Sequence, residues 1–212
     1  MPKPSQSNQH TAPPCDAILL AAGAGRRLGL PKALLEIQGI WMLPRIVSAL
    51  QAGGCERVVV VAREEQLHVI DTRGGCGAET LLANPDPDAG RTGSIQCGLA
   101  ALEPGRALMI HSCDIPLLSA DAVLQLRHAW AQEPSPQGLL ARLVTPGGKG
   151  GHPLLLGAEV VPEILQLAPQ EALRRIVHAD SDRLLNVVRR GDPGPFMDVD
   201  TREQLELLES LL

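Results

Sequence analysis

Residues 16–32 read Asp-Ala-Ile-Leu-Leu-Ala-Ala-Gly-Ala-Gly-Arg-Arg-Leu-Gly-Leu-Pro-Lys, an apolar run that passes directly into a glycine-rich, basic segment. The apolar run has the length and character of a buried strand. Gly23 and Gly25 let the following backbone approach a ligand closely and turn its N–H groups toward phosphate oxygens. Arg27 can bind phosphate as a fork and Lys32 as a point charge. The stretch therefore predicts a strand that leads into a phosphate-binding loop.

The rest of the chain alternates short β-rich runs with longer helical patterns. Several runs are almost continuously apolar, as in strands that helices cover on both faces. Strands are predicted at 16–22, 57–62, 79–83, 106–112, 138–144 and 184–189, and helices at 39–52, 64–71, 92–102, 119–132, 158–178 and 201–212. We therefore expect a single-domain α/β protein with a doubly wound, mostly parallel sheet of Rossmann-like type. Ligands of such sheets bind outside the carboxyl ends of the strands.

Two of the predicted helices begin with a capping signal. Thr201 and Gln204 have the spacing of a capping box ahead of a leucine-rich run. Ser119 can cap the helix that follows Asp114.

The amino-acid composition limits the classes of molecule that we expect the protein to bind. Of the 212 residues, 44% are hydrophobic, but there is one Phe, no Tyr and two Trp, so aromatic platforms for single-stranded nucleic acid are not expected. The net charge of −5 gives no general attraction for a polyanion, so phosphate binding must be local. We expect small-molecule ligands, with no nucleic acid and no membrane as partners, because no stretch approaches the roughly 18 apolar residues of a membrane span.

The N-terminal residues 1–14 are polar and proline-rich and are predicted to be disordered, which leaves one domain at 15–212. They lack the apolar core of a signal peptide. The five cysteines are scattered and include no Cys-x-x-Cys pair, as is typical of reduced thiols. We expect a cytoplasmic protein.

The glycine-rich loop does not fit two common nucleotide-binding motifs. It is not a dinucleotide fingerprint, because Leu28 occupies the third glycine position and no acidic residue lies between Glu36 and Glu56. It is not a Walker A loop, because no Gly-Lys-Ser/Thr follows the glycines. The remaining alternative to phosphate binding is a tight turn with solvated basic residues.

The loop resembles the pyrophosphorylase motif of the MobA-like nucleotidyltransferases, and a stretch of similarity to that family extends over about 16–208. The resemblance implies a nucleotidyltransferase domain with the fold of the NTP transferases. It also implies that the loop wraps a triphosphate, with Lys32 at the reacting centre and Arg27 beside it as catalytic residues. The nucleotide-binding residues expected from this loop are Leu20, Ala21, Ala22, Gly23, Gly25, Arg26, Arg27 and Lys32.

A second match, at 84–99, resembles the stretch that these enzymes place beside the nucleotide base and ribose. Arg91, Gly93 and Ser94 are the nucleotide-binding residues expected from it. Gly93 and Ser94 would lie at a helix N-terminus, where free N–H groups favour anions. An ordinary N-cap is the alternative for Ser94.

Three aspartates are candidate metal ligands. Asp114 follows the strand at 106–112 and precedes a proline turn, where a carboxylate is well placed to bind Mg²⁺, although a helix cap is the alternative. The resemblance makes Asp114 a metal ligand and part of the catalytic centre. Asp198 and Asp200 belong to a stretch similar to the family's C-terminal motif, and their alternation puts both on one face. Either can complete the metal site with Asp114.

The Gly-His-Pro run at 151–153 resembles the branch of molybdenum cofactor cytidylyltransferases, in which it faces the acceptor. His152 is therefore a candidate binding residue, with a structural role as the alternative. His111 and Cys113 are expected to pack rather than to react. The glycine-aspartate-arginine stretch that usually follows in this branch is absent, and 168–175 stands in its place.

The resemblance implies Mg²⁺-dependent transfer of CMP from CTP to a phosphate monoester, with molybdopterin as the expected acceptor and pyrophosphate released. No catalytic base is required, because the second pKa of such a nucleophile is about 6. Alternatives are methylerythritol-phosphate cytidylyltransferase, molybdopterin guanylyltransferase and, from another class, a non-catalytic nucleotide- or cofactor-binding protein. Product hand-over to a molybdoenzyme or its chaperone is a further expectation.

Overall fold

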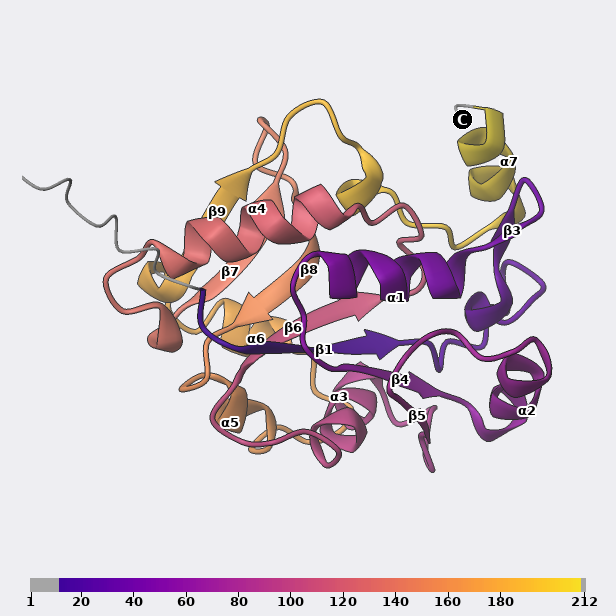
Figure 1. Cartoon of the computed structure of the whole chain (residues 1–212), viewed down its shortest axis with the longest axis horizontal. Helices are drawn as coiled ribbons and strands as arrows, with labels where there is room; N and C mark the ends of the chain where they lie inside the picture. The colour runs from indigo at the N-terminus through magenta and orange to yellow at the C-terminus, as the bar shows by residue number, and fades with distance from the viewer. Residues whose placement is uncertain (1–11, 211–212) are drawn as a thin grey trace, which may run out of the picture.

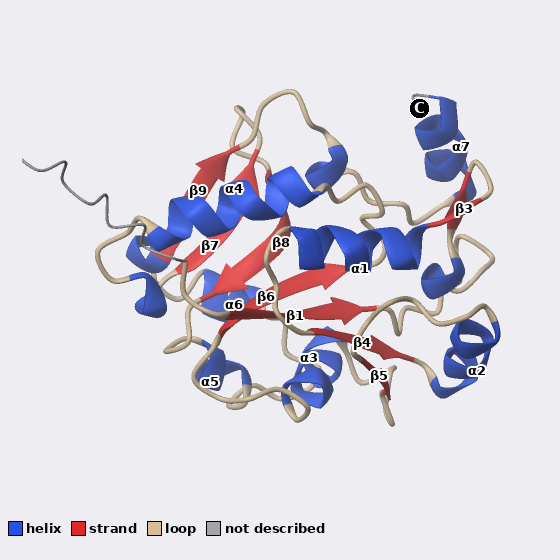
Figure 2. Cartoon of the chain, viewed as in Figure 1, coloured by secondary structure: helices blue, strands red, loops and turns tan. Residues whose placement is uncertain are grey.

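A computed structural model describes residues 12–210, in which a central sheet lies between two layers of helices (Figures 1 and 2). The sheet has seven strands in the order β5-β4-β1-β6-β8-β7-β9. Only β8 runs antiparallel to its neighbours β6 and β7, and the other pairings are parallel. The strands are β1 (Cys15–Leu20), β4 (Val58–Ala62), β5 (Thr80–Ala83), β6 (Ala107–Ser112), β7 (Leu140–Val144), β8 (Gly150–Leu156) and β9 (Leu184–Val188). The predicted fold class, a mostly parallel α/β sheet, is confirmed.

Each face of the sheet is covered by its own helices. All six residues of β1 are buried, with Ala17 and Leu19 in one core cluster and Ile18 and Leu20 in another. This alternation follows from the period of two along a strand. The first cluster contains side chains of α1 (Met42–Ala52), α2 (Glu64–Thr72) and α4 (Ala120–Ala131), and the second those of α3 (Arg91–Leu99), α5 (Val161–Ile164) and α6 (Arg174–Val177). Figure 1 shows α1 and α4 on one side of the sheet and α3 and α5 on the other.

Two predicted helices are wrong in extent. The region 158–178 is not one helix, because it forms only α5 and α6 with irregular chain between them. Pro169 lies in that irregular chain, and proline has no N–H to continue a helix. The helix predicted from residue 39 begins at Met42, since β2 (Glu36–Ile37) and β3 (Ile40–Trp41) form a small hairpin ahead of it.

The strand β8 was not among the six predicted strands. It begins Gly-Gly-His-Pro, a composition typical of turns, and proline is rare in the middle of a sheet. Its antiparallel direction brings the Gly-His-Pro run to the carboxyl end of β6.

The described part of the N-terminal region is held against the domain. Residues 1–11 of the segment predicted to be disordered lie outside the described residues. The carbonyl oxygen of Pro13 accepts a hydrogen bond from Arg127 at 3.0 Å, and that of Pro14 accepts one from the N–H of Ala107 at 3.1 Å. Both prolines are thus hydrogen-bonded to the domain through their carbonyl oxygens.

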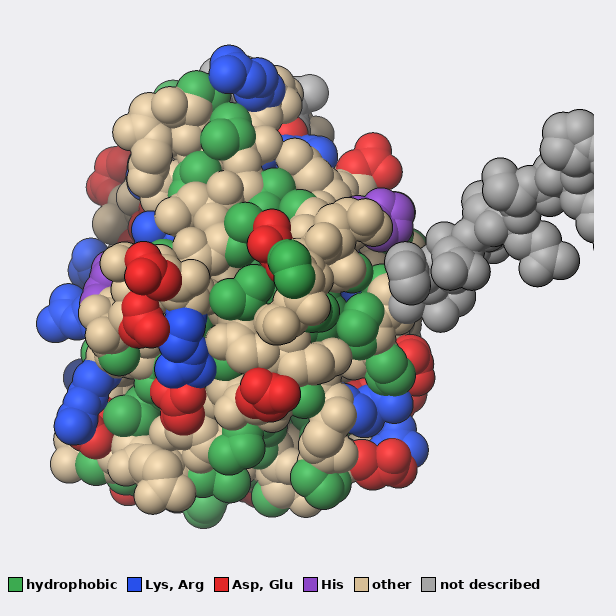
Figure 3. Space-filling model, turned by 90° about the vertical axis from the view of Figure 1, so that its left-hand side faces the viewer, with side chains coloured by type: hydrophobic (Ala, Val, Ile, Leu, Met, Phe, Trp, Pro, Cys, Tyr) green, Lys and Arg blue, Asp and Glu red, His purple; other side chains and the backbone are tan. Residues whose placement is uncertain are grey.

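The surface and the cysteines agree with the composition. Figure 3 views the end of the molecule at which β1 and β6 begin, and acidic, basic and apolar side chains are interspersed over it. The five cysteines are free. Within 12–210, no helix has the length and apolar character needed to cross a membrane.

Candidate active site

The glycine-rich loop leaves the carboxyl end of β1 and ends at Lys32, the first residue of a short 3-10 helix. Gly25 has a φ of 61°, in the left-handed region that glycine adopts without strain. A Cβ on Gly25 would lie 1.7 Å from the backbone oxygen of Leu30. Any other residue would therefore displace the loop.

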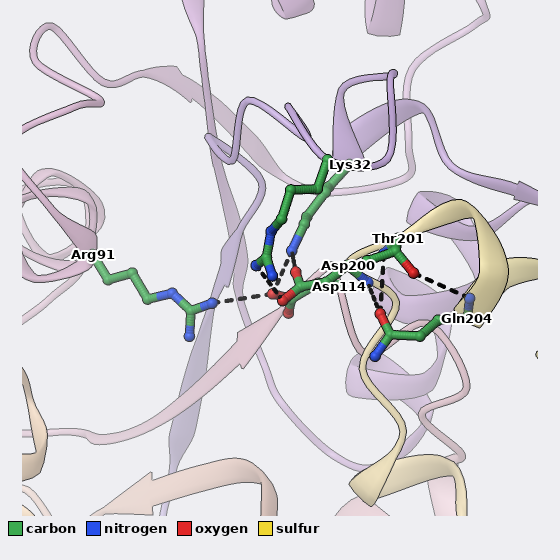
Figure 4. A network of polar contacts seen from close by, with 7 residues as sticks. Lys32, Arg91, Asp114, Asp200, Thr201 and Gln204 are labelled. Atoms are coloured by element: carbon green, nitrogen blue, oxygen red, sulfur yellow. Dashed lines mark hydrogen bonds and ion pairs between the residues drawn. The ribbon is translucent and has the colours of Figure 1, made fainter.

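A network of five charged side chains lies beside this loop (Figure 4). The ammonium of Lys32 donates to Asp114 at 2.9 Å and also to Asp200. Arg91 contacts the same oxygen of Asp114 at 3.1 Å, and Arg27 contacts Asp200 at 2.7 Å. The side chains of Lys32 and Asp114 are only 12% and 6% exposed, whereas those of Arg27 and Arg91 are 72% and 68% exposed. The network thus has a buried centre and two cations that reach solvent.

The surroundings keep the central groups charged. Burial alone would lower the pKa of Lys32, but hydrogen bonds to Asp200 and Asp114 outweigh it and the pKa is raised above its ordinary value. Burial also opposes ionisation of Asp114, yet hydrogen bonds from Ser112 and Lys32 hold the pKa of Asp114 below its usual range. The hydrogen bond from Lys32 likewise lowers the pKa of Asp200. All three groups are therefore ionised around neutral pH.

Backbone contacts fix the two carboxylates relative to each other. The N–H of Val199 donates to the carbonyl of Asp114 at 2.7 Å, which ties the C-terminal segment to the end of β6. The N–H of Asp200 donates to the side chain of Gln204 at 2.7 Å, and the N–H of Gln204 donates to the Thr201 hydroxyl at 3.3 Å. The capping box predicted for α7 (Arg202–Ser210) is confirmed, and it also positions Asp200.

A cleft of about 180 Å³, which we call the loop cleft, opens beside the network. Its walls combine glycine-rich backbone with the charged centre, as a phosphate site requires. It is lined by Leu20, Ala22, Gly23, Lys32, Pro87, Gly90, Arg91, Ser94, Ser112, Cys113 and Asp114. Most of these residues were predicted as ligands. Four residues predicted from the glycine-rich loop, Ala21, Gly25, Arg26 and Arg27, do not line the cleft. Ala21 is buried in the core, Arg26 is exposed, and Arg27 contacts Asp200.

The start of α3 forms the opposite wall of the loop cleft. The hydroxyl of Ser94 accepts a hydrogen bond from Asn84 at 2.8 Å, so both side chains are held in place. The N–H of Gly93 donates to the carbonyl of Pro169 at 3.3 Å. The predicted free N–H of Gly93 is therefore used within the protein, whereas Arg91 and Ser94, also predicted from this stretch, line the cleft.

His152 and Asp198 lie outside the loop cleft. His152 lines a neighbouring cavity, and burial lowers the pKa of its imidazole. Asp198 is exposed and, within 12–210, makes no side-chain hydrogen bond or ion pair. The structure thus brings Asp200, of the two C-terminal aspartates, to Asp114.

His111 and Cys113 are buried and uncharged. Burial lowers the pKa of His111 to about 3 and raises the pKa of Cys113 to about 12. The ring of His111 meets that of His152 edge to face, with 5.7 Å between centroids. A neutral imidazole and a protonated thiol agree with the packing roles expected for both.

The sequence analysis missed one residue that supports the loop. Arg63 directly follows β4, and its Nε donates to the carbonyl of Ala22 at 2.8 Å. Its Nη2 pairs with Asp88 at 2.5 Å. The signal that identified the other candidates, a polar residue at the carboxyl end of a strand, applies equally to Arg63.

Comparison with known proteins gives the family of the chain. The model of the MobA-like NTP transferase domain matches residues 17–184, so the chain belongs to this family. The family and its cytidylyl- and guanylyltransferase relatives confirm the enzyme class expected from the sequence.

The proteins that are similar in sequence to this chain carry the names of different enzymes. The chain is 28% identical to nicotine blue oxidoreductase of Paenarthrobacter nicotinovorans over 91% of its length and 95% of that protein. It is 28% identical to a probable molybdenum cofactor guanylyltransferase of Rhodopirellula baltica over 86% of its length and 83% of that protein. Identity to the 2-C-methyl-D-erythritol 4-phosphate cytidylyltransferase of Rhodococcus opacus is 37%, but it covers only 54% of this chain and 52% of that enzyme.

Solved structures share the fold. Rv0371c of Mycobacterium tuberculosis, determined in complex with manganese, superposes with a TM-score of 0.73 at 18% identity, over 94% of this chain and 100% of that chain. The 4-diphosphocytidyl-2C-methyl-D-erythritol synthase of Anaerococcus prevotii gives a TM-score of 0.69 at 15% identity, over 95% and 99%.

Proposed function

We propose that the chain transfers CMP from CTP to a phosphate monoester, with molybdopterin as the acceptor, and releases pyrophosphate. The observation that carries the proposal is the position of Lys32, whose ammonium lies between Asp114 and Asp200 in the wall of the loop cleft. A fixed cation there stabilises the negative charge that grows as the α-phosphorus is attacked.

Asp114 and Asp200 would hold Mg²⁺. Both carboxylates contact one ammonium, so they face the same point, and carboxylate oxygens are ligands that Mg²⁺ prefers. The described residues contain no group of three or more His, Cys, Asp or Glu side chains suited to a metal. Phosphate oxygens and water would therefore complete the coordination. The bound ion would supply charge neutralisation at the triphosphate.

The chain's own residues position and neutralise the reactants. Arg27 and Arg91 are largely exposed and can turn from the carboxylates to phosphate oxygens. Lys32 stays buried at the reacting centre. The acceptor phosphate attacks in line without a protein base, because it is already largely dianionic near neutral pH. Positioning and charge neutralisation would therefore account for catalysis.

The choice of substrates rests on sequence details. The Leu-Ala-Ala-Gly start of the loop supports CTP, because the loop of the guanylyltransferases normally reads Leu-Ala-Gly-Gly. The Gly-His-Pro run at 151–153 supports molybdopterin. The guanylyltransferase relative supports GTP as the alternative nucleotide, and the methylerythritol-phosphate cytidylyltransferase relative supports a polyol phosphate as the alternative acceptor. Hand-over of the product to a molybdoenzyme or its chaperone would follow from the molybdopterin assignment.

Pyrophosphate release tests the proposal. Wild-type protein with Mg²⁺, CTP and molybdopterin should release pyrophosphate, and the Lys32→Met variant should release it about 10²–10³-fold more slowly. Arg57, directly before β4, pairs with Glu103 at the surface. Arg57→Gln also removes one positive charge, so it is the matched control and should keep full turnover. If pyrophosphate is released only with GTP, the nucleotide in the proposal is wrong and the reaction class stands. If it is released only with 2-C-methyl-D-erythritol 4-phosphate, the acceptor is wrong and the reaction class stands.

Two outcomes would contradict nucleotidyl transfer itself. The first is nucleotide binding without pyrophosphate release from any of these pairs, as expected of a binding-only protein. The second is binding of a redox cofactor in place of nucleoside triphosphates; the oxidoreductase relative is the reason to include such a cofactor in the test.

A further inference from the structure

A second cavity, of about 450 Å³, adjoins the loop cleft. We call it the arginine cavity, because Arg91, Arg142 and Arg174 line it. It shares Leu20 and Arg91 with the loop cleft, and Arg91 contacts Asp114. One end of a molecule bound in the arginine cavity can therefore reach the proposed reacting centre, while most of the molecule stays in the arginine cavity.

The order of the strands determines how the residues of the arginine cavity follow one another across the sheet. Ile110 on β6 pairs with Leu154 on β8, and Leu154 pairs with Arg142 on β7. These three residues therefore form one row across the sheet, and all three line the cavity. Neighbouring strands are about 4.8 Å apart, so the backbone of Arg142 lies roughly 10 Å from that of Ile110. The cavity thus has an apolar floor and a cation at the side away from the loop cleft.

Two of the cations have no carboxylate partner. Within 12–210, Arg142 and Arg174 form no ion pair. The Nε of Arg142 donates to the amide oxygen of Asn186 at 2.9 Å, and its terminal nitrogens have no protein acceptor among the described residues. The carboxylate in the wall, Glu171, is already bound by Arg175 and by the N–H of Ala168. In a chain of net charge −5, this local excess of positive charge favours an anion.

Two more features indicate a binding site. A Cβ on Gly150 would lie 2.8 Å from Nη1 of Arg142, so the glycine makes room for the guanidinium. Nδ1 of His152 is buried without a hydrogen-bond partner among the described residues, and His152 lines the cavity. A buried polar atom of this kind is costly unless a ligand or water satisfies it.

We propose that Arg142 and Arg174 form an anion subsite for a second acidic group of the acceptor, distinct from its reacting phosphate. The acceptor class is an organic phosphate monoester whose body has an apolar face and whose far side carries a second anion, which in molybdopterin would be the ionised dithiolene. The role of acceptor rests on the proposed function, but the selectivity for a second anion is a binding property. It is measurable without turnover.

A matched pair of probes tests the subsite. Phenyl phosphate and 4-carboxyphenyl phosphate differ only in the second anion. Their dissociation constants would be measured by calorimetry with Mg²⁺ and a CTP analogue that carries a methylene group between the α- and β-phosphorus. The wild type should bind 4-carboxyphenyl phosphate about ten-fold more tightly, as expected of a charge-assisted contact. The Arg142→Gln/Arg174→Gln double variant should reduce that ratio to within about two-fold of one, and Arg57→Gln should retain it.

Three results would overturn the subsite. They are equal affinities in the wild type, an unchanged ratio in the double variant, or no measurable binding of 4-carboxyphenyl phosphate. The proposed function fails separately, through absent pyrophosphate release. Selective binding without turnover would therefore contradict the function and leave the subsite standing.

Discussion

Two ion networks lie at opposite ends of the same sheet. They share one local arrangement of charges, but only one of them belongs to the candidate active site. At the amino end, Arg106 lies between Asp16 and Glu56, at 2.9 and 2.6 Å. At the carboxyl end, Lys32 lies between Asp114 and Asp200. Both networks place one cation against two carboxylates, and both include a carboxylate that is almost fully buried.

The difference lies in what surrounds each centre. Arg27 and Arg91 add two largely exposed cations at the carboxyl end, which gives three cations against two carboxylates there. The amino end keeps one cation against two carboxylates. Only the carboxyl-end network can attract phosphate. An ion pair therefore indicates a functional site through its excess charge and its place in the sheet, and not through burial alone.

The largest expected effect is on turnover. Lys32→Met removes the central cation and should lower turnover by about 10²–10³-fold, the size seen when one preorganised donor to a developing charge is lost. The free energy of unfolding should change by about 1 kcal/mol or less, because Arg91 and water still reach Asp114. Steady-state kinetics and urea unfolding would measure the two quantities. Equal turnover in variant and wild type would remove the contrast between the networks.

The loop offers the next test. Gly25→Ala should abolish nucleotide binding, because its Cβ would clash with the Leu30 carbonyl. Gly29→Ala is the matched control: Gly29 also has a positive φ, of 82°, but the nearest atom to its Cβ would be 3.6 Å away. The control should cost about 1–2 kcal/mol of stability and keep binding. Calorimetric titration with CTP would compare them, and similar binding in both variants would contradict a role for the loop geometry.

The amino-end network should affect stability alone. Arg106→Gln leaves Asp16 buried without its partner and should lower the free energy of unfolding by about 2 kcal/mol, below the roughly 3–5 kcal/mol of a fully buried pair because Arg106 touches solvent. Turnover should stay within about two-fold of the wild type. A large loss of turnover in correctly folded Arg106→Gln protein would show that the two ends are not separable.

The smallest effect is a pH dependence. The lowered pKa values of Asp114 and Asp200 contribute stability that is present above their unfolded values of about 3.9 and is lost as pH falls through the folded values. The raised pKa of Lys32 contributes stability below its unfolded value of about 10.4, lost as pH rises further. The stability difference between wild type and Asp114→Asn should therefore be constant between about pH 5 and 9 and shrink below about pH 4. Urea unfolding across this range would detect a different profile.

The sequence predicted the parts of the fold that depend on local pattern. Continuous apolar runs identified six strands, and the capping signals at Ser119 and Thr201 are confirmed. β8 was missed because Gly150 and Pro153 resemble a turn, and its place in the sheet depends on partners far away in sequence. The helix predicted at 158–178 failed because tertiary contacts, such as the one between Gly93 and Pro169, replace helical hydrogen bonds there.

In the site too, the sequence predicted what depends on local motifs and not what depends on contacts between distant segments. Lys32 and Asp114 were identified from motifs at strand ends, and the structure brings them together. The choice between Asp198 and Asp200 was not available from the sequence, because the segment before α7 is irregular and alternation does not describe it. The position of Arg142 also depends on long-range strand pairing, so no local motif could have indicated its cavity.

Nucleotide-dependent thermal stability tests the central claim most directly, with CTP, GTP, ATP and UTP each measured in Mg²⁺ and in EDTA. At a hundred times its dissociation constant, a ligand stabilises the native state by about 2.7 kcal/mol, and each kcal/mol raises the Tm of a chain this size by about 2–4 °C. We predict a Mg²⁺-dependent rise in Tm with CTP in the wild type that is lost in Lys32→Met. Absence of a shift with every nucleotide, or an equal shift in the variant, would contradict the assignment of the carboxyl-end network to nucleotidyl transfer.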